Sequence, residues 1–499
     1  IKMGEIKKFK RVLVANRGEI AIRVFRACRE LGIRTVAIYS EEDKNSLFRT
    51  KADEAYQIGK GKTPVGVYLS IDEIIALAKA KGVDAIHPGY GFLAENVEFA
   101  KACQDAGIEF IGPTAEMMDR LGDKIKSKIV ASDVGVPTIP GVEKAITTEE
   151  EAVEFAEKCG YPVMLKAAAG GGGRGMRIVQ NAEELLPQFR SARSEAAKAF
   201  GIDDIFIEKY LENPKHIEVQ ILGDKYGNIV HLFERDCSIQ RRHQKVIEFT
   251  PALCLSDQQR EDICQDALKI AHAVDYRSAG TVEFLVDKTG QHYFIEMNPR
   301  IQVEHTVSEI VTGIDIVQDQ ILVAQGYALN SPEIAIPDQD AIKVTGHAIQ
   351  CRITTEDPAN GFMPDTGIIE NYRSPGGFGI RLDGGNGFEG SEITPFYDSL
   401  LVKVTAFSRT FEDTRRKAIR ALSEMVIKGI KTNVAFMLNV LNHPTFAAGM
   451  CDTGFIANTP DLLNIEKVED NELKVIEFLG NKFVNETKGH KPQFNVPVF

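Results

Sequence analysis

Hydrophobic positions in the first third of the chain follow two periods, one typical of strands and one typical of helices. Short, mostly β-branched runs at Arg11–Ala15, Thr35–Tyr39 and Val83–His87 predict buried strands. Helical periodicity covers Glu19–Leu31 and Ile71–Lys81, and a glycine follows each segment. Repeated strand–helix–strand units predict a parallel sheet with helices on both faces and a ligand site at the carboxyl ends of the strands.

A smaller unit follows a helix that we predict over residues 123–135. Its expected strands are Pro162–Ala167, Met176–Gln180 and Asp204–Tyr210, with a helix over about Ala182–Phe200. The first two strands flank a run of glycines. This pattern indicates a small unit built around a glycine loop.

Beyond Ile217 the pattern is mainly that of strands. Polar and apolar residues alternate there, and the turns Asp224–Asn228 and Asp287–Gln291 each contain glycine. We therefore predict antiparallel hairpins. Further helical segments are expected near Ser256–Val274, Ile310–Gln325 and Phe411–Lys428.

Composition excludes several classes of protein. Of the 499 residues, 43% are hydrophobic and 26% charged, which is typical of globular enzymes and not of disordered or fibrous chains. The net charge of −12 argues against a nucleic-acid partner, and the absence of an apolar run of about 18 residues argues against a membrane partner. None of the eight cysteines forms a C-x-x-C pair, so we expect reduced thiols in a cytosol or an organelle matrix.

The strongest local signal is the segment from Lys166 to Met176, which contains four consecutive glycines at 170–173. Glycines let backbone N–H groups approach an anion closely, and Lys166 adds a positive charge. The segment is neither a Walker loop nor a dinucleotide fingerprint, because a strand follows it. A lid that closes over phosphates fits the pattern, and a flexible surface hairpin is an equal alternative.

A second signal lies in the hairpin Thr281–Met297. Glu283 and Glu296 fall on adjacent strands, and Asn298 shares the face of Glu296 if the strand continues. Two carboxylates and an amide oxygen suit Mg²⁺ that bridges nucleotide phosphates. The alternative is a pair of solvated glutamates on an open sheet face.

Two charged segments complete the picture. Pro299 breaks the strand, so Arg300 and Glu304 are expected on an irregular segment, as an anion ligand and a base or else as a surface ion pair. Residues 235–245 form a basic loop between strands, which we interpret as a phosphate site or an exposed basic patch. The four signals are complementary, and together they indicate ATP-dependent phosphoryl transfer.

Longer motifs run through the chain in a fixed order: VANRGEIA, HPGYGFLAEN, GDK, KAAAGGGGRGM, EKYLENPKHIE, ERDCSIQRRHQK, FIEMNPRIQVEH and TEDP. In this order they resemble the biotin carboxylase component of biotin-dependent carboxylases, a member of the ATP-grasp superfamily. The resemblance extends from about Lys10 to Ile456. The later segments are most similar to the pyruvate-specific branch, with the acetyl-CoA and propionyl-CoA branches as alternatives.

The resemblance implies an α/β and α+β fold of the ATP-grasp type. We expect a Rossmann-like parallel-sheet subdomain over 1–122, a helical linker over 123–137 and a glycine-loop lid over 138–210. A mainly antiparallel subdomain would follow over 211–457, and a tail over 458–499 would lead toward the next domain.

The resemblance also implies roles for individual residues. The expected ATP ligands are Lys124, Lys166, Gly171, Gly172, Gly173, Glu208, Lys209, Leu211, His216, Gln240 and His243. The expected metal ligands, for Mg²⁺ or Mn²⁺, are Glu283, Glu296 and Asn298. Bicarbonate and biotin would meet Arg300, Gln302, Val303, Tyr90 and Arg352. The catalytic groups would be Glu304 as the base, Arg352 at the biotin enolate, Arg300 and Lys245.

The implied reaction is carboxylation of biotin at N1′ through carboxyphosphate, driven by ATP and bicarbonate. Biotin would be carried on a separate domain, because the chain has no Ala-Met-Lys-Met attachment motif. The expected partners are biotin-carrier and carboxyltransferase domains, with the chain as the front part of a longer enzyme. We also expect a homodimer, a tetramer for the full-length enzyme, and a bacterial cytoplasmic location rather than the mitochondrial matrix.

Two other classes of function remain open on the sequence. Another ATP-grasp ligase would share the lid and the metal carboxylates without needing HPGYGF or the arginine of CRITTEDP. A non-enzymatic nucleotide-binding subunit would tolerate loss of the base or the metal ligands, and both are present.

Overall fold

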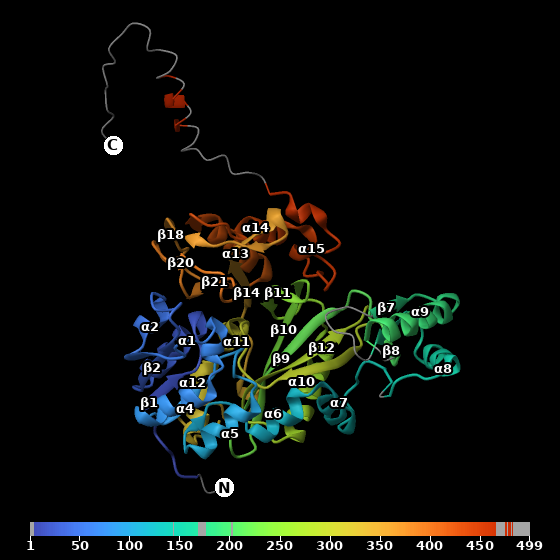
Figure 1. Ribbon diagram of the computed structural model, residues 1–499, viewed down its shortest axis with the longest axis horizontal. Helices are drawn as coiled ribbons and strands as arrows, with labels where there is room; N and C mark the ends of the chain where they lie inside the picture. Colours follow the sequence, from blue (N-terminus) through green and yellow to red (C-terminus); the bar gives the residue numbers. More distant parts are fainter. Residues whose placement is uncertain are drawn as a thin grey trace.

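Three sheets of three or more strands organise the protein. The computed structural model describes residues 4–142, 144–167, 176–200 and 203–465, together with 475–476, 478–480 and 482. The five-stranded, three-stranded and eight-stranded sheets lie in different parts of the molecule (Figure 1). The fold is therefore mixed α/β and α+β, as predicted.

The N-terminal sheet is entirely parallel, with strand order β3-β2-β1-β4-β5. Its strands are β1 (Arg11–Val14), β2 (Arg34–Tyr39), β3 (Glu54–Gln57), β4 (Ala85–His87) and β5 (Glu109–Phe110). The helices of this region are α1 (Gly18–Glu30), α2 (Leu47–Lys51), α3 (Pro64–Tyr68), α4 (Ile71–Ala80), α5 (Val97–Asp105) and α6 (Ala115–Gly122). The predicted strand–helix alternation is confirmed, although β3 and β5 carry too few apolar residues to be recognised in the sequence.

The three-stranded sheet forms a small unit to one side of the largest sheet (Figure 1). Its antiparallel strands are β6 (Val163–Ala167), β7 (Met176–Val179) and β8 (Ile205–Lys209), in the order β7-β6-β8. Helices α8 (Glu149–Cys159) and α9 (Ala182–Phe200) pack with these strands around a separate apolar core, and α7 (Lys124–Asp133) precedes the unit. A strand does follow the glycine run, as predicted.

The eight-stranded sheet is antiparallel throughout, in the order β13-β12-β9-β10-β11-β14-β21-β19. Its strands are β9 (Lys215–Gly223), β10 (Ile229–Arg241), β11 (Gln244–Thr250), β12 (Ser278–Val286), β13 (His292–Asn298), β14 (His347–Thr354), β19 (Ile380–Gly384) and β21 (Leu400–Ser408). The two predicted hairpins are β9–β10 and β12–β13.

Helices cover this sheet, and two of the predicted helical segments need correction. The helices are α10 (Asp257–Ala273), α11 (His305–Thr312), α12 (Ile316–Gln325), α13 (Phe411–Glu424), α14 (Val434–Asn442) and α15 (Pro444–Ala447). Residues 310–325 are not one helix, because Gly313 ends α11 at a φ of +71° and Asp315 caps α12. The segment 411–428 ends its helix at Glu424, and β22 (Val426–Lys428) then pairs with β18 (Asn371–Arg373).

The basic segment 235–245 is also not a loop. Strand β10 continues to Arg241 and β11 begins at Gln244, which leaves only Arg242 and His243 in the turn. Both turn residues have positive φ, +49° and +66°, as a tight hairpin turn requires. The segment therefore belongs mainly to the sheet, and its exposed part is limited to residues 242–244 at the turn.

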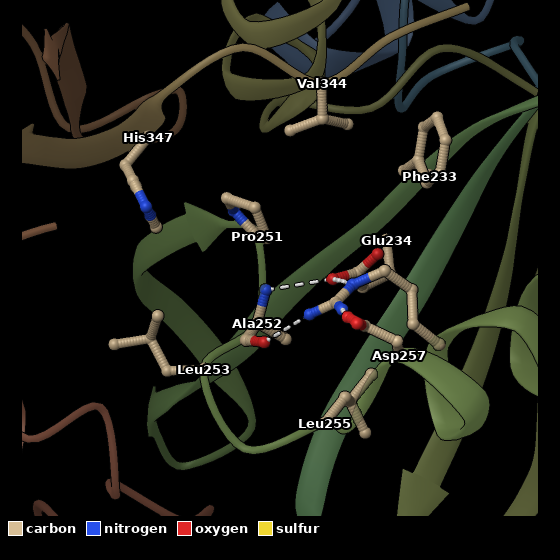
Figure 2. Close-up of a pocket in the computed structure, with 10 residues that line it drawn as sticks. Phe233, Glu234, Pro251, Ala252, Leu253, Leu255, Asp257, Val344 and His347 are labelled. Carbon is tan, nitrogen blue, oxygen red and sulfur yellow. Dashed lines mark hydrogen bonds and ion pairs between the residues drawn. The ribbon is translucent and has the colours of Figure 1, made fainter. Parts of the chain in front are cut away.

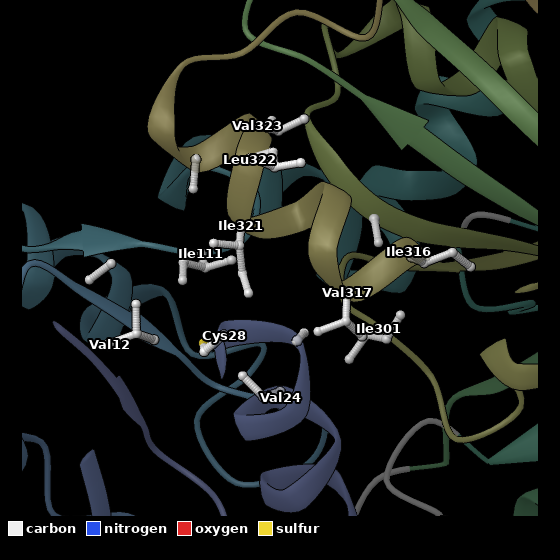
Figure 3. Close-up of a cluster of buried hydrophobic side chains, with 14 of the residues drawn as sticks. Val12, Val24, Cys28, Ile111, Ile301, Ile316, Val317, Ile321, Leu322 and Val323 are labelled. Carbon is white, nitrogen blue, oxygen red and sulfur yellow. The ribbon is translucent and has the colours of Figure 1, made fainter. Parts of the chain in front are cut away.

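A shared apolar core joins the N-terminal sheet to α12 (Figure 3). Val12 of β1 and Val24 of α1 belong to the same buried cluster as Val317 and Ile321 of α12. Ile301, from the irregular segment after β13, lies in this cluster at 1% exposure. The segment that carries Arg300 and Glu304 is thereby anchored to two subdomains. No described helix is long and apolar enough to cross a membrane.

Candidate active site

Lys245 of β11 lies at the centre of a buried cluster of charges. Its ammonium donates to Glu218 at 2.6 Å, to Glu283 at 2.9 Å and to Glu304 at 2.7 Å. These three carboxylates come from β9, β12 and the residue just before α11. The fold thus brings the predicted base, a predicted metal ligand and a predicted catalytic lysine within hydrogen-bond distance.

Strand register explains much of this convergence. Glu296 lies opposite Glu283, Glu283 lies opposite Glu218, and Glu218 lies opposite Arg235 on the next strand. Directly paired residues share one face of a sheet, so a single row of charges crosses four strands. A bulge between Glu283 and Phe284 leaves Ile295 without a partner and turns Phe294 into the core.

Glu304 is held from two sides. Besides Lys245, the Arg352 guanidinium of β14 donates to Glu304 at 2.9 Å and also pairs with Glu248 of β11. Glu304 is 2% exposed and directly precedes α11. The alternative interpretation, a surface ion pair between Arg300 and Glu304, is wrong, because Arg300 pairs with Glu95 at 2.9 Å and Glu304 is buried.

The buried guanidinium of Arg235 orders the floor of the cluster. It donates five hydrogen bonds, and its exposure is 0%. The acceptors are Glu218, Gln220, Thr281, Gln302 and Ser308, at 2.6–3.2 Å. Gln302 in turn donates to Glu283 at 2.9 Å. The predicted bicarbonate residue Gln302 is therefore fixed by a residue that we had expected on a basic loop.

The charges of the cluster shift one another's pKa values. Burial opposes ionisation of Glu304, but Lys245 and Arg352 outweigh it and hold the Glu304 pKa well below its usual range. Burial acts in the same way on Glu283, and Lys245 and His216 lower its pKa as well. Burial acts to lower the pKa of Lys245, and its carboxylate neighbours raise it well above the ordinary value. At neutral pH these groups are ionised.

The three predicted metal ligands supply hard oxygen donors on one edge of the sheet. Glu283 and Glu296 are cross-strand partners, and Asn298 donates its side-chain amide to Glu283 at 2.8 Å. Glu283 is 4% exposed, so the alternative of two solvated glutamates is wrong for this residue. A buried carboxylate beside further oxygen donors fits a hard divalent cation.

The predicted bicarbonate and biotin residues border the cluster. Arg300 donates to the Asn298 side-chain oxygen at 3.1 Å, which ties it to the metal edge. The Tyr90 hydroxyl donates to Glu19 of α1, and the Val303 carbonyl accepts from Lys403 of β21 at 3.0 Å. The residues expected to meet small anions and biotin therefore come from three separate chain segments.

The predicted nucleotide residues are distributed more widely. His216 contacts Glu283 at 2.9 Å and Gln240 at 3.0 Å, which brings two of the expected ATP ligands to the metal edge. Lys166 of β6 pairs with Glu208 of β8. Lys209 ends β8 and Leu211 follows it, whereas His243 is exposed at the hairpin turn. The Lys124 side chain and the glycines Gly171, Gly172 and Gly173 lie outside the described residues.

Sequence reasoning missed several residues of the cluster. Glu218 and Glu248 are fully buried partners of Lys245 and Arg352, and Glu19 and Lys403 support Tyr90 and Val303. Glu218 sits between Ile217 and Val219 in an alternating strand, where polar residues ordinarily indicate a solvated face. The sequence did not indicate that both faces of this strand are buried.

A pocket of about 380 Å³ lies elsewhere, between Phe233 and Glu234 of β10 and the loop before α10 (Figure 2). Glu234 accepts there from the Ala252 amide at 3.0 Å and from Arg260 at 2.8 Å. Among the described residues, its lining contains none of the predicted site residues. We therefore assign the chemistry to the charged cluster and not to this pocket.

Family models match most of the chain in three consecutive parts. Residues 8–118 match the biotin carboxylase N-terminal domain, and residues 350–458 match the biotin carboxylase C-terminal domain. Residues 123–332 match the ATP-binding domain of the carbamoyl-phosphate synthase L chain.

Individual relatives agree with this division. The chain is 55% identical over 496 residues to pyruvate carboxylase of Bacillus subtilis, covering 99% of this chain and 43% of that protein. The biotin carboxylase domain of a thermophilic 2-oxoglutarate carboxylase, solved with ADP, is 49% identical with a TM-score of 0.86 over 92% of this chain and 100% of that one. A dimer of that domain from Hydrogenobacter thermophilus, solved with MgADP, ADP and bicarbonate, has a TM-score of 0.82 at 49% identity, over the same shares.

The parallel sheet, the small three-stranded unit that we predicted as the lid, and the charged cluster on an antiparallel sheet are together those of an ATP-grasp enzyme, one of the ATP-dependent ligases. Within that class, the chain belongs to the biotin carboxylase family. It spans about 43% of the length of the Bacillus relative.

Proposed function

We propose that this chain carboxylates biotin at N1′ with ATP and bicarbonate, through carboxyphosphate. The observation that carries the proposal is the placement of Glu304 between Lys245 and Arg352, at 2.7 and 2.9 Å. One carboxylate there faces both a cation suited to phosphate and a cation suited to an enolate. The same Lys245 ammonium also donates to Glu283, a predicted metal ligand.

The first step is activation of bicarbonate by Glu304. Because two cations hold the Glu304 pKa low, this carboxylate is a weak base in the ligand-free arrangement. It gains basicity when Lys245 or Arg352 turns toward an anionic substrate. Arg300 and Gln302 then hold bicarbonate beside the base, so that its proton passes to a Glu304 oxygen.

The second step is attack of the bicarbonate oxygen on the γ-phosphorus of ATP, with ADP as the leaving group. Glu283, Glu296 and Asn298 would hold a divalent cation, Mg²⁺ or Mn²⁺, which would supply charge neutralisation at the phosphates. Lys245 stabilises the charge on the transferring group, and Lys166 contributes from the lid.

The third step transfers the carboxyl group. Carboxyphosphate divides into CO₂ and phosphate, the phosphate takes the N1′ proton, and N1′ then bonds to the carbon of CO₂. Arg352 stabilises the ureido oxygen as it becomes negative, because its guanidinium remains charged at any working pH. Exclusion of water protects carboxyphosphate from hydrolysis.

We further propose that the chain works within a longer enzyme that carboxylates pyruvate. Biotin would arrive on a carrier domain, and a carboxyltransferase domain would complete the reaction. The identity to a pyruvate carboxylase supports pyruvate over 2-oxoglutarate, acetyl-CoA and propionyl-CoA as the acceptor. Assays of the full-length enzyme with these four acceptors test this choice, and preference for another acceptor would reject it.

We also propose a homodimer, which becomes part of a tetramer in the full-length enzyme. The dimer of the Hydrogenobacter relative supports this assembly. Light scattering on the purified chain should give twice the monomer mass of 55.1 kDa. A bacterial cytoplasmic location is the corresponding proposal for the cell, since all eight cysteines are free thiols; recovery in another cell fraction would contradict it.

The central test is ADP release with and without bicarbonate and free biotin. We expect bicarbonate-dependent release that biotin accelerates. Release that needs an amine or ammonia instead would favour another ATP-grasp ligase. Nucleotide binding without any turnover would favour a regulatory subunit.

Arg352→Ala tests whether biotin carboxylation and ATP binding depend on different residues. Biotin carboxylation should be lost while ATP affinity stays within about threefold, because Arg352 faces Glu304 and Glu248 and not the predicted nucleotide residues. The exposed Arg409→Ala is the matched control. Collapse of ATP binding in Arg352→Ala would show that its role is misassigned.

A further inference from the structure

Lys403 is a fully buried lysine outside the predicted site. It lies in the middle of β21, opposite Arg352 on one side and Asp383 on the other, and its side chain is 0% exposed. Lysine is almost never fully buried unless its charge is paired. Its partners therefore indicate why the charge is kept.

One partner is the backbone of the predicted bicarbonate segment. The Lys403 ammonium donates to the Val303 carbonyl at 3.0 Å. Val303 directly precedes Glu304, so this hydrogen bond fixes the peptide plane that joins the two residues. The orientation of that peptide decides where its N–H and the Glu304 side chain point.

The second partner leads to the predicted biotin residue. The Lys403 ammonium lies 3.2 Å from one oxygen of Glu19, and the other oxygen of Glu19 accepts from the Tyr90 hydroxyl. Glu19 is buried in the first turn of α1. Lys403 is therefore connected to Tyr90 through the Glu19 carboxylate, and to Glu304 through the peptide that follows Val303.

We propose that Lys403 is a positioning residue that couples the bicarbonate segment at Val303 to the biotin residue Tyr90. This inference rests on the proposed function, because it assigns Lys403 to the same reaction. It adds a residue that touches none of the reacting atoms. Without Lys403 the bicarbonate segment and the Tyr90 region would still form, but their relative positions would not be fixed.

The competing explanation is a purely structural charge. Asp383 also lies opposite Lys403, and Arg381 pairs with Asp383 at 2.8 Å, so the lysine belongs to a larger buried network. A structural lysine would change stability alone. A positioning lysine would change the dependence of the rate on bicarbonate and biotin.

The test uses Lys403→Met and Lys403→Arg in the chain as it exists. For Lys403→Met we expect the KM values for bicarbonate and biotin to rise about tenfold while ATP affinity is unchanged. Lys403→Arg, which keeps a donor to both partners, should recover part of that loss. Ile270→Ala, which removes a fully buried side chain of α10 remote from these contacts, is the control for lost stability.

A double variant tests the connection itself. If Lys403 acts on biotin through Glu19 and Tyr90, Lys403→Met combined with Tyr90→Phe should raise the biotin KM little more than the larger single effect. Multiplying effects would overturn the coupling. Unchanged KM values in a folded Lys403→Met, or changes that Ile270→Ala reproduces, would overturn the positioning role.

A low yield of Lys403→Met does not remove the test. Glu19→Gln breaks the same chain one contact further on, and it should raise the biotin KM more than the bicarbonate KM. An unchanged biotin KM would overturn the proposal. If the wild type itself lacks bicarbonate-dependent ATP cleavage, the proposed function fails first, so the two failures are distinguishable.

Discussion

The predicted catalytic lysine, Lys245, and the predicted ATP ligand Lys166 lie in contrasting surroundings. Lys245, on the large sheet, has a side-chain exposure of 14% and contacts three carboxylates. Lys166, in the lid, has an exposure of 37% and contacts one carboxylate, Glu208. The charges of the large sheet are desolvated and fixed before any ligand arrives, whereas those of the lid are still screened by water. We therefore expect the charges of the large sheet to be preorganised for the proposed reaction, and Lys166 of the lid to act mainly in binding.

Removal of the base should have the largest effect. Glu304→Gln keeps the shape of the residue but cannot accept a proton, so bicarbonate-dependent ATP cleavage should fall by about 10²- to 10⁴-fold. ATP affinity should change little. Measurements of kcat together with ATP binding would check this, and retained cleavage would exclude Glu304 as the base.

Removal of Lys245 should be costly for the fold as well as for the reaction. Lys245→Met leaves Glu218, Glu283 and Glu304 without their common cation, and loss of one partner from a buried ion pair typically costs about 3–5 kcal/mol. Urea unfolding at pH 7 measures the change in free energy. A loss below about 1 kcal/mol would mean that the cluster is as solvated as the lid.

Replacement of a buried carboxylate near other acids should have the opposite effect and raise the free energy of unfolding. Burial, followed by the charges of Asp315 and Glu309, raises the pKa of Asp319 on α12 to about 8. An unfolded aspartate titrates near 3.9, so this group removes stability as the pH rises from about 4 to 8. Asp319→Asn should raise the free energy of unfolding at pH 8 by roughly 2–4 kcal/mol, and much less at pH 4. The exposed Asp340→Asn is the control, and an equal gain at both pH values would contradict the prediction.

The smallest effect on stability is expected in the lid. Lys166→Met should change the free energy of unfolding by less than about 1 kcal/mol, because exposed ion pairs contribute little. Its KM for ATP should rise while the cleavage step per bound ATP is largely retained. A stability loss as large as that of Lys245→Met would erase the contrast between the two regions.

The sequence predicted elements well where one face alone is buried, and less well elsewhere. The helix Ser256–Val274 was recognisable because its apolar stripe and its capping serine act locally. The break at Gly313 has local signals, the glycine and the capping Asp315, but the apolar periodicity of residues 310–325 continues across it. The strand Val426–Lys428 depends on β18, a partner distant in the chain. Local periodicity contains no information about such partners.

The site residues also divide into those recognised in the sequence and those whose role depends on contacts distant in the chain. Glu283 and Glu304 stood out because a hairpin and a proline break place them beside other charged or polar residues, and the family resemblance added Arg352. Glu218 and Glu248 did not, because their importance arises only when α11 and Arg352 cover the inner face of the sheet. The pairing of Arg300 with Glu95, 205 positions away, likewise follows from packing between subdomains.

The five hydrogen bonds of Arg235 have a consequence for assembly. They reach β9, β12, the segment after β13 and α11, and they use all five donors of the guanidinium. In a partly folded state in which α11 has left the sheet, the Arg235 guanidinium loses Ser308 and keeps one donor without its acceptor. Docking of that helix and completion of the reaction centre are therefore one cooperative event, and a lysine at this position, with three donors, would leave at least two acceptors unmatched.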